Sequence, residues 1–206
     1  MWLGRRFARL ATDLVVRFPT LWSLFRRPLA LQFDRLAPRW DEIRSPGHLA
    51  PLEAALDALD SPRRVVDLGT GTGAAAVLTA QLFPEAEIVG VDLSPGMIEE
   101  ARRKLPPELS ARVRFETADS ASLPFDDGDF DLVLLLNMIP FFDELARVLA
   151  PGGHAVFSFS NGAATPIYVS PERLRSELAR RSFAEFAEVS AGTGTALITR
   201  KSTERQ

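Results

Sequence analysis

Cysteine is absent from this chain of 206 residues, and histidine occurs only twice, at His48 and His154. The absence of cysteine excludes disulfides and thiolate metal sites. Two histidines are too few for a histidine-rich metal centre, so we expect no bound metal. The uncharged apolar runs are far shorter than the roughly 20 residues that a membrane-spanning helix needs. No secretory signal is expected either, because Arg9 and Asp13 interrupt the N-terminal apolar region.

What the chain does contain fits one well-buried domain with an appendage, since 46% of its residues are hydrophobic and 25% are charged. The formal net charge is −3, but the charge is unevenly placed. Residues 1–39 hold eight arginines and only two aspartates. This asymmetry indicates that the N-terminal part meets something anionic. The acidity of the remainder disfavours a nucleic acid as the partner.

Residues 2–18 are predicted to form an amphipathic helix that ends before Pro19. A second apolar run, residues 21–25, is expected to end at Pro28. Two interpretations stay open for this region. The helix packs on its own domain or on a second copy in a homodimer, or residues 1–27 lie on an anionic membrane surface. The protein is accordingly expected in the cytoplasm, and in the second case at the inner face of the membrane. The apolar side of the helix is formed mainly by Leu3, Phe7, Leu10 and Leu14.

The stretch from Arg64 to Asp92 has the pattern of a strand, a glycine-rich turn, a helix and a second strand. The turn is Gly69-Thr70-Gly71-Thr72-Gly73. Its glycines allow a sharp bend and leave no Cβ in the way of a ligand. The helix that follows presents free N–H groups and the positive end of its dipole. An acidic residue about 20 positions beyond such a loop can bind both hydroxyls of a ribose. We therefore predict a nucleoside site here.

Two cofactors fit this loop. The spacing Gly69-x-Gly71-x-x-Ala74 satisfies the looser dinucleotide fingerprint, which makes a nicotinamide-dependent oxidoreductase one alternative. The spacing Asp67-x-Gly69-x-Gly71-x-Gly73 resembles the first motif of class I S-adenosylmethionine-dependent methyltransferases. The first alternative lacks other support, because Glu172 stands four residues after Tyr168, the only tyrosine. The Tyr-x-x-x-Lys pair of short-chain reductases is therefore missing.

Further along the chain, apolar runs alternate with helical segments. Ser94 and Pro95 are expected to begin a helix, and a third strand is expected at residues 112–116. The continuous run Leu132–Leu136 is typical of a parallel strand buried on both faces. After a helix at residues 171–182, alternating residues predict a final antiparallel pair of strands.

Two phrases later in the sequence identify a family. These are Leu123-Pro124-Phe125-Asp126-Asp127-Gly128-Asp129-Phe130-Asp131 and Arg147-Val148-Leu149-Ala150-Pro151-Gly152-Gly153. Together they strongly resemble the ubiquinone/menaquinone C-methyltransferase-like branch of the class I methyltransferases. The resemblance is close over about residues 64–160 and looser over residues 33–63.

This resemblance implies a Rossmann-like three-layer α/β sandwich. Its mostly parallel seven-stranded sheet would have the order 3-2-1-4-5-7-6, with the last strand antiparallel. It also implies an N-terminal helical arm and lid (residues 1–62), an S-adenosylmethionine-binding core (residues 63–201) and a short tail (residues 202–206). The cofactor would be S-adenosylmethionine, and S-adenosylhomocysteine would be its product. The implied cofactor-binding residues are Asp67, Gly69, Thr70, Gly71 and Gly73 at the methionine end, Asp92 at the ribose, Asp119 and Ser120 at the adenine, Leu93 and Met97 against the ring, and Asn137 and Met138 at the boundary with the acceptor.

The methyl acceptor is expected to be a small lipophilic molecule such as a quinone or a lipid. An acceptor that must lose a proton would need a base, and His48 and Asp41 are the candidates. A cofactor-binding protein without catalytic activity, acting as a scaffold or regulator, remains an alternative. The expected acceptor pocket consists of Trp40, Ile139, Phe141, Phe142 and Tyr168.

Overall fold

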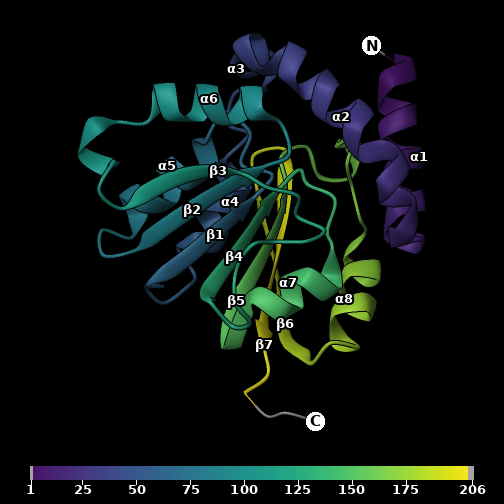
Figure 1. The fold of residues 1–206 in the computed structure, drawn as a ribbon. Helices are drawn as coiled ribbons and strands as arrows, with labels where there is room; N and C mark the ends of the chain where they lie inside the picture. The colour runs from purple at the N-terminus through teal and green to yellow at the C-terminus, as the bar shows by residue number, and fades with distance from the viewer. Residues whose placement is uncertain (1, 204–206) are drawn as a thin grey trace.

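The computed structural model describes the backbone of residues 2–203 and the side chains of residues 8–203. A seven-stranded sheet of order β3-β2-β1-β4-β5-β7-β6 forms the centre of the molecule (Figure 1). Strand β7 pairs antiparallel with both β5 and β6, and the remaining neighbours are parallel. The predicted fold class is therefore confirmed. The strands are β1 (Arg64–Leu68), β2 (Glu87–Asp92), β3 (Val113–Thr117), β4 (Phe130–Leu136), β5 (Leu149–Phe159), β6 (Phe183–Ala191) and β7 (Gly194–Lys201).

Helices cover both faces of the sheet because its central strands are apolar on both sides. Side chains from β1 and β4 alternate between two buried clusters. Val65 and Leu132 face the layer of α4, α5 and α6, whereas Val66 and Val133 face the layer of α7 and α8. The helices are α1 (Trp2–Arg17), α2 (Trp22–Leu36), α3 (Trp40–Ile43), α4 (Ala50–Leu56), α5 (Ala74–Leu82), α6 (Pro95–Lys104), α7 (Phe142–Val148) and α8 (Pro171–Ala179).

Local sequence explains where α6 begins. The hydroxyl of Ser94 accepts a hydrogen bond of 3.1 Å from the backbone N–H of Met97, and Pro95 is the first helical residue. This cap fixes the chain directly after Asp92, at the carboxyl end of β2.

Helix α2 extends well beyond the apolar run at residues 21–25. The helix continues through Pro28 to Leu36, although a proline usually ends or bends a helix. Pro28 lies on the exposed side of α2, so its ring does not have to fit into the packed face. The long α2 then runs beside α6 and reaches across the top of the sheet (Figure 1).

The predicted N-terminal arm contains two kinds of structure. Helix α4 packs on the sheet, and Leu52, Ala55 and Leu56 are completely buried there. Helices α1–α3 instead lie across the carboxyl ends of the strands (Figure 1). The described part of α1 packs on its own domain through Ala11 and Val15. Leu10, on the predicted apolar side, is 58% exposed, so the packed side differs from the predicted one. The side chains of Leu3 and Phe7 lie outside the described residues. Among the described helices, none has the length and apolar character needed to cross a membrane.

Candidate cofactor site

The glycine-rich loop between β1 and α5 requires its glycines. Gly69, Gly71 and Gly73 have φ angles of +70°, +56° and +86°, in the left-handed region that side chains disfavour. A Cβ atom on Gly69 would lie 2.6 Å from the sulfur of Met138. A Cβ atom on Gly73 would lie 2.6 Å from the ring of Phe115. The loop therefore follows a path that only glycine allows at these positions.

Asp67 lies beneath this loop and is completely buried. Its Oδ2 accepts a hydrogen bond of 2.6 Å from the hydroxyl of Thr70, and its Oδ1 has no hydrogen-bond partner. Burial raises the pKa of Asp67 to about 6, although the Thr70 hydrogen bond opposes that rise. An unpaired buried carboxylate oxygen is unfavourable by itself, so a cationic ligand at this position would stabilise it.

Asp92 joins the end of β2 to the loop. Its two oxygens accept hydrogen bonds of 2.9 Å from the backbone N–H groups of Gly71 and Ser94. Burial raises the pKa of Asp92, and these hydrogen bonds oppose the rise. Each carboxylate oxygen has a further lone pair, so the same group can also accept from ribose hydroxyls. As predicted, Asp92 lies at the carboxyl end of the second strand, β2.

Asp119, the predicted adenine-binding residue, is already bound by the N-terminal arm. Its Oδ1 accepts a hydrogen bond of 2.8 Å from the indole N–H of Trp22 and one of 3.0 Å from the backbone of Ala121. The guanidinium of Arg26 lies 3.8 Å from its Oδ2. Ser120 beside it is buried. No local pattern predicts this pairing, because Trp22 and Asp119 are 97 positions apart.

Residues 22–48, here called the covering segment, bind the core through two further carboxylates. Asp34 accepts from the hydroxyl of Ser94 and the backbone of Gly96, at 2.5 and 2.9 Å. Asp41 accepts from Thr72 in the glycine loop and from Lys104 on α6, at 2.6 and 2.7 Å. The covering segment is thus hydrogen-bonded to the same loop and helix that the sequence predicts to hold a cofactor.

Two donors of the covering segment face the glycine loop. A Cβ atom on Gly71 would lie 3.2 Å from Nη2 of Arg44 and 3.3 Å from Nε1 of Trp40. The indole N–H of Trp40 is buried without a hydrogen-bond partner. Only 15% of the Arg44 side chain is exposed. Arg44 was not among the predicted site residues, because nothing in the sequence distinguishes it from the other arginines of the arm.

The two candidate bases have different surroundings. Nε2 of His48 lies 3.3 Å from Nη1 of Arg44, and its Nδ1 lies 3.1 Å from the carbonyl of Ser45. Because arginine can only donate, Nε2 must accept and Nδ1 must carry the proton. Burial and the charge of Arg44 lower the pKa of His48, which keeps the ring neutral. For Asp41, burial alone would raise the pKa, but hydrogen bonds from Lys104 and Thr72 outweigh it and lower the pKa.

Asn137 and Met138, the residues predicted at the boundary between cofactor and acceptor, have different surroundings. The side chain of Met138 lies against Gly69. The amide of Asn137 donates to the hydroxyl of Ser160 and accepts from its backbone N–H, both at 2.9 Å. Asn137 therefore ties the end of β4 to the end of β5. Leu93 is half-buried beside Ile139, and Met97 is buried completely.

The predicted acceptor pocket is not gathered in one place. Ile139 and Phe141 pack with Trp22, whose ring centroid lies 5.1 Å from that of Phe141. Phe142 belongs to the core under α7, and Tyr168 packs on Phe159 with a centroid distance of 5.0 Å. The fifth predicted residue, Trp40, lies over the glycine loop.

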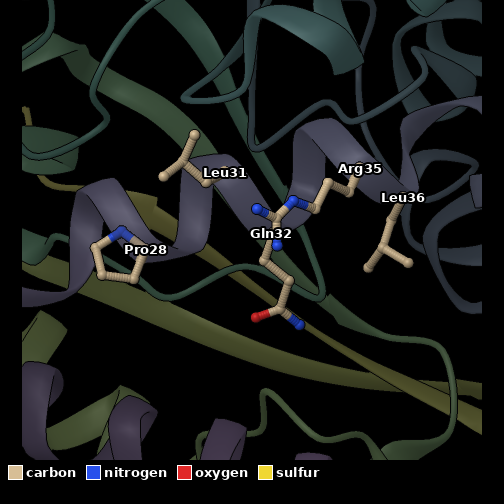
Figure 2. A pocket seen from close by; sticks show the side chains of 5 residues that line it. All are labelled: Pro28, Leu31, Gln32, Arg35 and Leu36. Atoms are coloured by element: carbon tan, nitrogen blue, oxygen red, sulfur yellow. The ribbon is translucent and has the colours of Figure 1, made fainter.

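A groove of about 520 Å³ lies on the outer side of α2 instead (Figure 2). None of its lining residues belongs to the predicted site. They are Pro28, Leu31, Gln32, Arg35 and Leu36. Within residues 2–203, the structure holds no group of three or more histidine, aspartate or glutamate side chains that could hold a metal ion.

The sheet order gives a Rossmann-like fold, and the glycine-rich loop and the acid at the end of β2 lie at its carboxyl edge, where open α/β sheets bind ligands. The comparison with known proteins agrees. Residues 65–153 match the family described as "Methyltransferase domain". A demethylmenaquinone methyltransferase of Thermus thermophilus is 41% identical over 137 residues, which are 60% of this chain and 62% of that protein. A trans-aconitate 2-methyltransferase of Methylobacterium nodulans is 46% identical over 102 residues, 46% of this chain and 37% of that protein.

A similar fold is found in the crystal structure of an S-adenosylmethionine-dependent methyltransferase from Aquifex aeolicus. The TM-score is 0.66 at 17% identity, over 80% of this chain and 97% of the other. The chain spans less than two thirds of the length of the two relatives named above. The chain is thus similar, over residues 65–153, to methyltransferase domains, and over a longer stretch to demethylmenaquinone methyltransferases.

Proposed function

We propose that this protein transfers the methyl group of S-adenosylmethionine to a small lipophilic acceptor. The observation that carries the proposal is the unpaired, buried Oδ1 of Asp67 beneath a loop of three left-handed glycines. The cofactor bears an amino group and a sulfonium centre, and both are cationic. A buried anion under a loop with glycine at three positions is the chemistry that such a ligand needs.

The chain's own residues have distinct roles in this proposal. Asp67 and the glycine loop hold the methionine end, and Asp92 accepts hydrogen bonds from the ribose. Asp119 and Ser120 receive the adenine once Trp22 has released Asp119. Leu93 and Met97 line the ring side, and Met138 lies between cofactor and acceptor. The bound cofactor supplies an already electrophilic methyl group, so the protein mainly aligns the acceptor and excludes water.

Of the two candidate bases, the proposal favours His48. Its ring is neutral and its Nε2 is an acceptor, so it can take a proton when Arg44 moves away. Asp41 is a weaker base, because Lys104 and Thr72 stabilise its ionised form. An acceptor that does not need to lose a proton would require neither residue.

The lipophilic acceptor is supported by the apolar cluster of Val15, Trp22, Ile139 and Phe141 at the carboxyl edge of the sheet. The relative from Thermus thermophilus is named for demethylmenaquinone, whereas the one from Methylobacterium nodulans is named for trans-aconitate. A quinone-like molecule suits an apolar cluster, and a tricarboxylate does not. We therefore place a quinone-like acceptor or a lipid first.

The outer face of α2 supports contact with an anionic membrane. Leu24 and Leu31 are 68% and 59% exposed. Arg27 and Arg35 share their face of the helix, since the four positions follow the i, i+3, i+7, i+11 spacing. Exposed leucines flanked by arginines are the pattern of a helix that lies on a membrane surface. Such a surface would bring the enzyme to a lipid-dissolved acceptor.

The proposal is tested by incubating the protein with isotopically labelled S-adenosylmethionine and either a demethylated quinone analogue or trans-aconitate. Mass spectrometry should find the label in the quinone and S-adenosylhomocysteine in equal amount. Labelled trans-aconitate without labelled quinone would refute the lipophilic acceptor. No tight binding of S-adenosylmethionine in calorimetry would refute the cofactor assignment.

One observation favours a second candidate, a cofactor-binding protein that does not catalyse. Trp22 donates a hydrogen bond to Asp119, the carboxylate expected to bind the adenine. The covering segment is also hydrogen-bonded to the glycine loop, through Asp41 and Thr72. In a regulatory protein, cofactor binding could release the covering segment from the glycine loop, and the released segment would signal that the cofactor is bound. Cofactor binding with no methyl transfer to any member of a broad acceptor panel would favour this candidate.

A further inference from the structure

Four groups converge on the glycine loop, and two of them lack partners. Asp67 and Asp92 approach it from the sheet, and Trp40 and Arg44 approach it from the covering segment. The unpartnered atoms are Oδ1 of Asp67, an acceptor, and Nε1 of Trp40, a donor. A ligand that satisfies both must itself carry a donor and an acceptor, and a cationic donor suits the Asp67 carboxylate best.

Arg44 is held beside the loop without a close counter-ion. Its nearest carboxylate oxygen, on Asp41, is 3.8 Å away, and Asp41 already accepts hydrogen bonds from Lys104 and Thr72. Burial lowers the pKa of Arg44, while the charges of Asp41, Asp67 and Asp92 oppose that change. Its Nη1 faces His48, and its Nη2 faces Gly71. A largely buried guanidinium in this position is suited to a small anion.

The amino-acid end of the proposed cofactor carries both charges that these groups require. Its α-ammonium group is a cationic donor, and its α-carboxylate is an anionic acceptor. We propose that Arg44, with the indole N–H of Trp40, binds the α-carboxylate of S-adenosylmethionine, and that Oδ1 of Asp67 binds the α-ammonium group. This inference rests on the proposed function. It adds Arg44 and Trp40 to the cofactor-binding residues and gives the covering segment a part in the site.

The inference separates the contribution of each charge, so ligands that lack one or both charges can test it. Decarboxylated S-adenosylmethionine keeps the ammonium and sulfonium groups and lacks only the carboxylate. 5′-Methylthioadenosine lacks both the carboxylate and the ammonium group. Calorimetry with the full-length chain measures the affinity of each ligand and requires no acceptor and no turnover.

Arg44→Gln should weaken binding of S-adenosylmethionine by about 10- to 100-fold, because a charge-assisted hydrogen bond is lost. The affinity for decarboxylated S-adenosylmethionine should change by less than about threefold. Arg44→Lys should restore part of the loss, since it keeps the charge but not the planar fork. The matched control is Arg39→Gln, an exposed arginine of the same segment that pairs with Glu42. It should leave all three affinities unchanged.

Asp67→Asn should show the complementary pattern. It should weaken both S-adenosylmethionine and its decarboxylated form, by about tenfold or more, and leave 5′-methylthioadenosine nearly unchanged. Retained binding of 5′-methylthioadenosine also shows that each variant is folded.

Three outcomes would overturn the inference. If Arg44→Gln weakens the normal and decarboxylated ligands equally, or weakens neither, Arg44 does not bind the carboxylate and the methyltransferase proposal stands. If Asp67→Asn spares S-adenosylmethionine, the ammonium group lies elsewhere. If the unaltered protein binds none of the three ligands, both this inference and the proposed function fail.

Discussion

The indole Nε1 of Trp22 donates a hydrogen bond of 2.8 Å to Oδ1 of Asp119, which joins the first residue of α2 to the loop after β3. The same carboxylate is expected to bind the adenine amino group. The indole and the adenine are both donors to one acceptor group, so they compete for it.

Trp22→Phe should therefore strengthen cofactor binding. The phenyl ring is smaller than the indole but keeps an aromatic contact with Phe141, and it lacks the competing N–H. Because a neutral donor to a charged acceptor contributes about 1–2 kcal/mol, we expect the affinity for S-adenosylhomocysteine to rise about 5- to 30-fold. Calorimetry measures this change. Phe25→Leu, a half-buried apolar change on the same helix, is the control and should have little effect. A weaker affinity in Trp22→Phe would show that Trp22 assists the cofactor.

Asp67 should make stability depend on pH. Its pKa is raised from 3.8 to about 6 by burial, so the folded protein holds this proton more tightly than the unfolded chain does. The resulting stabilisation is complete below about pH 4 and is lost as the pH rises through about 6. Asp67→Asn should consequently raise the free energy of unfolding by about 1–3 kcal/mol at pH 8 and by much less at pH 4.5.

Urea unfolding without ligand, measured at both pH values, tests this expectation. The exposed Asp57→Asn on the surface near α4 is the control and should show no such difference. An Asp67→Asn variant that loses stability at pH 8 would mean that the Thr70 hydrogen bond matters more than the burial of the charge.

Asp92→Ala should weaken binding of S-adenosylmethionine by about 1–3 kcal/mol, because charge-assisted hydrogen bonds to the ribose would be lost. It also removes the acceptor for the backbone of Gly71, so the loop should exchange its amide hydrogens faster. Calorimetry and hydrogen exchange measure the two effects. Asp126→Ala, in an exposed turn, is the control. Unchanged affinity in Asp92→Ala would refute the assignment of the ribose site.

The glycine loop offers a matched pair of substitutions. Gly73 and Gly47 have similar left-handed φ angles of +86° and +72°. A Cβ on Gly73 would collide with the ring of Phe115, whereas nothing lies within 4 Å of a Cβ on Gly47. Gly47→Ala should cost about 1 kcal/mol of backbone strain, and Gly73→Ala about 1–3 kcal/mol more because of the collision. Equal losses in urea unfolding would show that Phe115 moves aside without cost.

The outer face of α2 should govern membrane binding. The double variant Leu24→Ser and Leu31→Ser should lower recovery with floated phosphatidylglycerol vesicles several-fold, since each buried leucine contributes about 1.5–3 kcal/mol. Arg27→Gln with Arg35→Gln should lower recovery mainly at low salt. Gln81→Ser, exposed on α5, is the control. Equal recovery of all variants, or equal recovery with neutral vesicles, would contradict a membrane role for this face.

The core of the fold could be predicted because its signals are local. The continuous apolar run of β4, the Ser94 cap of α6 and the glycines after β1 each act through neighbouring residues. The antiparallel pair at the end of the sheet was likewise visible in the alternation of β6 and β7. The length of α2 was not predicted from the apolar run at residues 21–25, and the exposed ring of Pro28 allows the helix to continue beyond that run.

The site was predicted only in part, since its remaining contacts join distant segments. Asp67 and Asp92 were recognisable from their places at the ends of β1 and β2. Arg44 was not, because only the folded chain brings its guanidinium to Gly71. Asn137 was expected to face the cofactor from the end of β4, but the neighbouring strand supplies Ser160 as its partner. Sequence spacing within one segment carries no information about either contact.

The free edge of the sheet has a consequence for how copies of this protein can meet. In β6, the pairing with β7 shifts register between Ala184 and Ala187, and Glu185 within that shift has a φ of +57°. This irregular backbone, with Glu185 and Glu188 exposed along it, cannot present an even row of hydrogen-bonding groups to another strand. Two molecules are therefore not expected to join their sheets into one across β6. The other edge strand of the sheet is β3. A homodimer that uses neither edge strand would be formed by helical surfaces. The exposed side of α2 could then bind either a second molecule or a lipid surface, but not both at once.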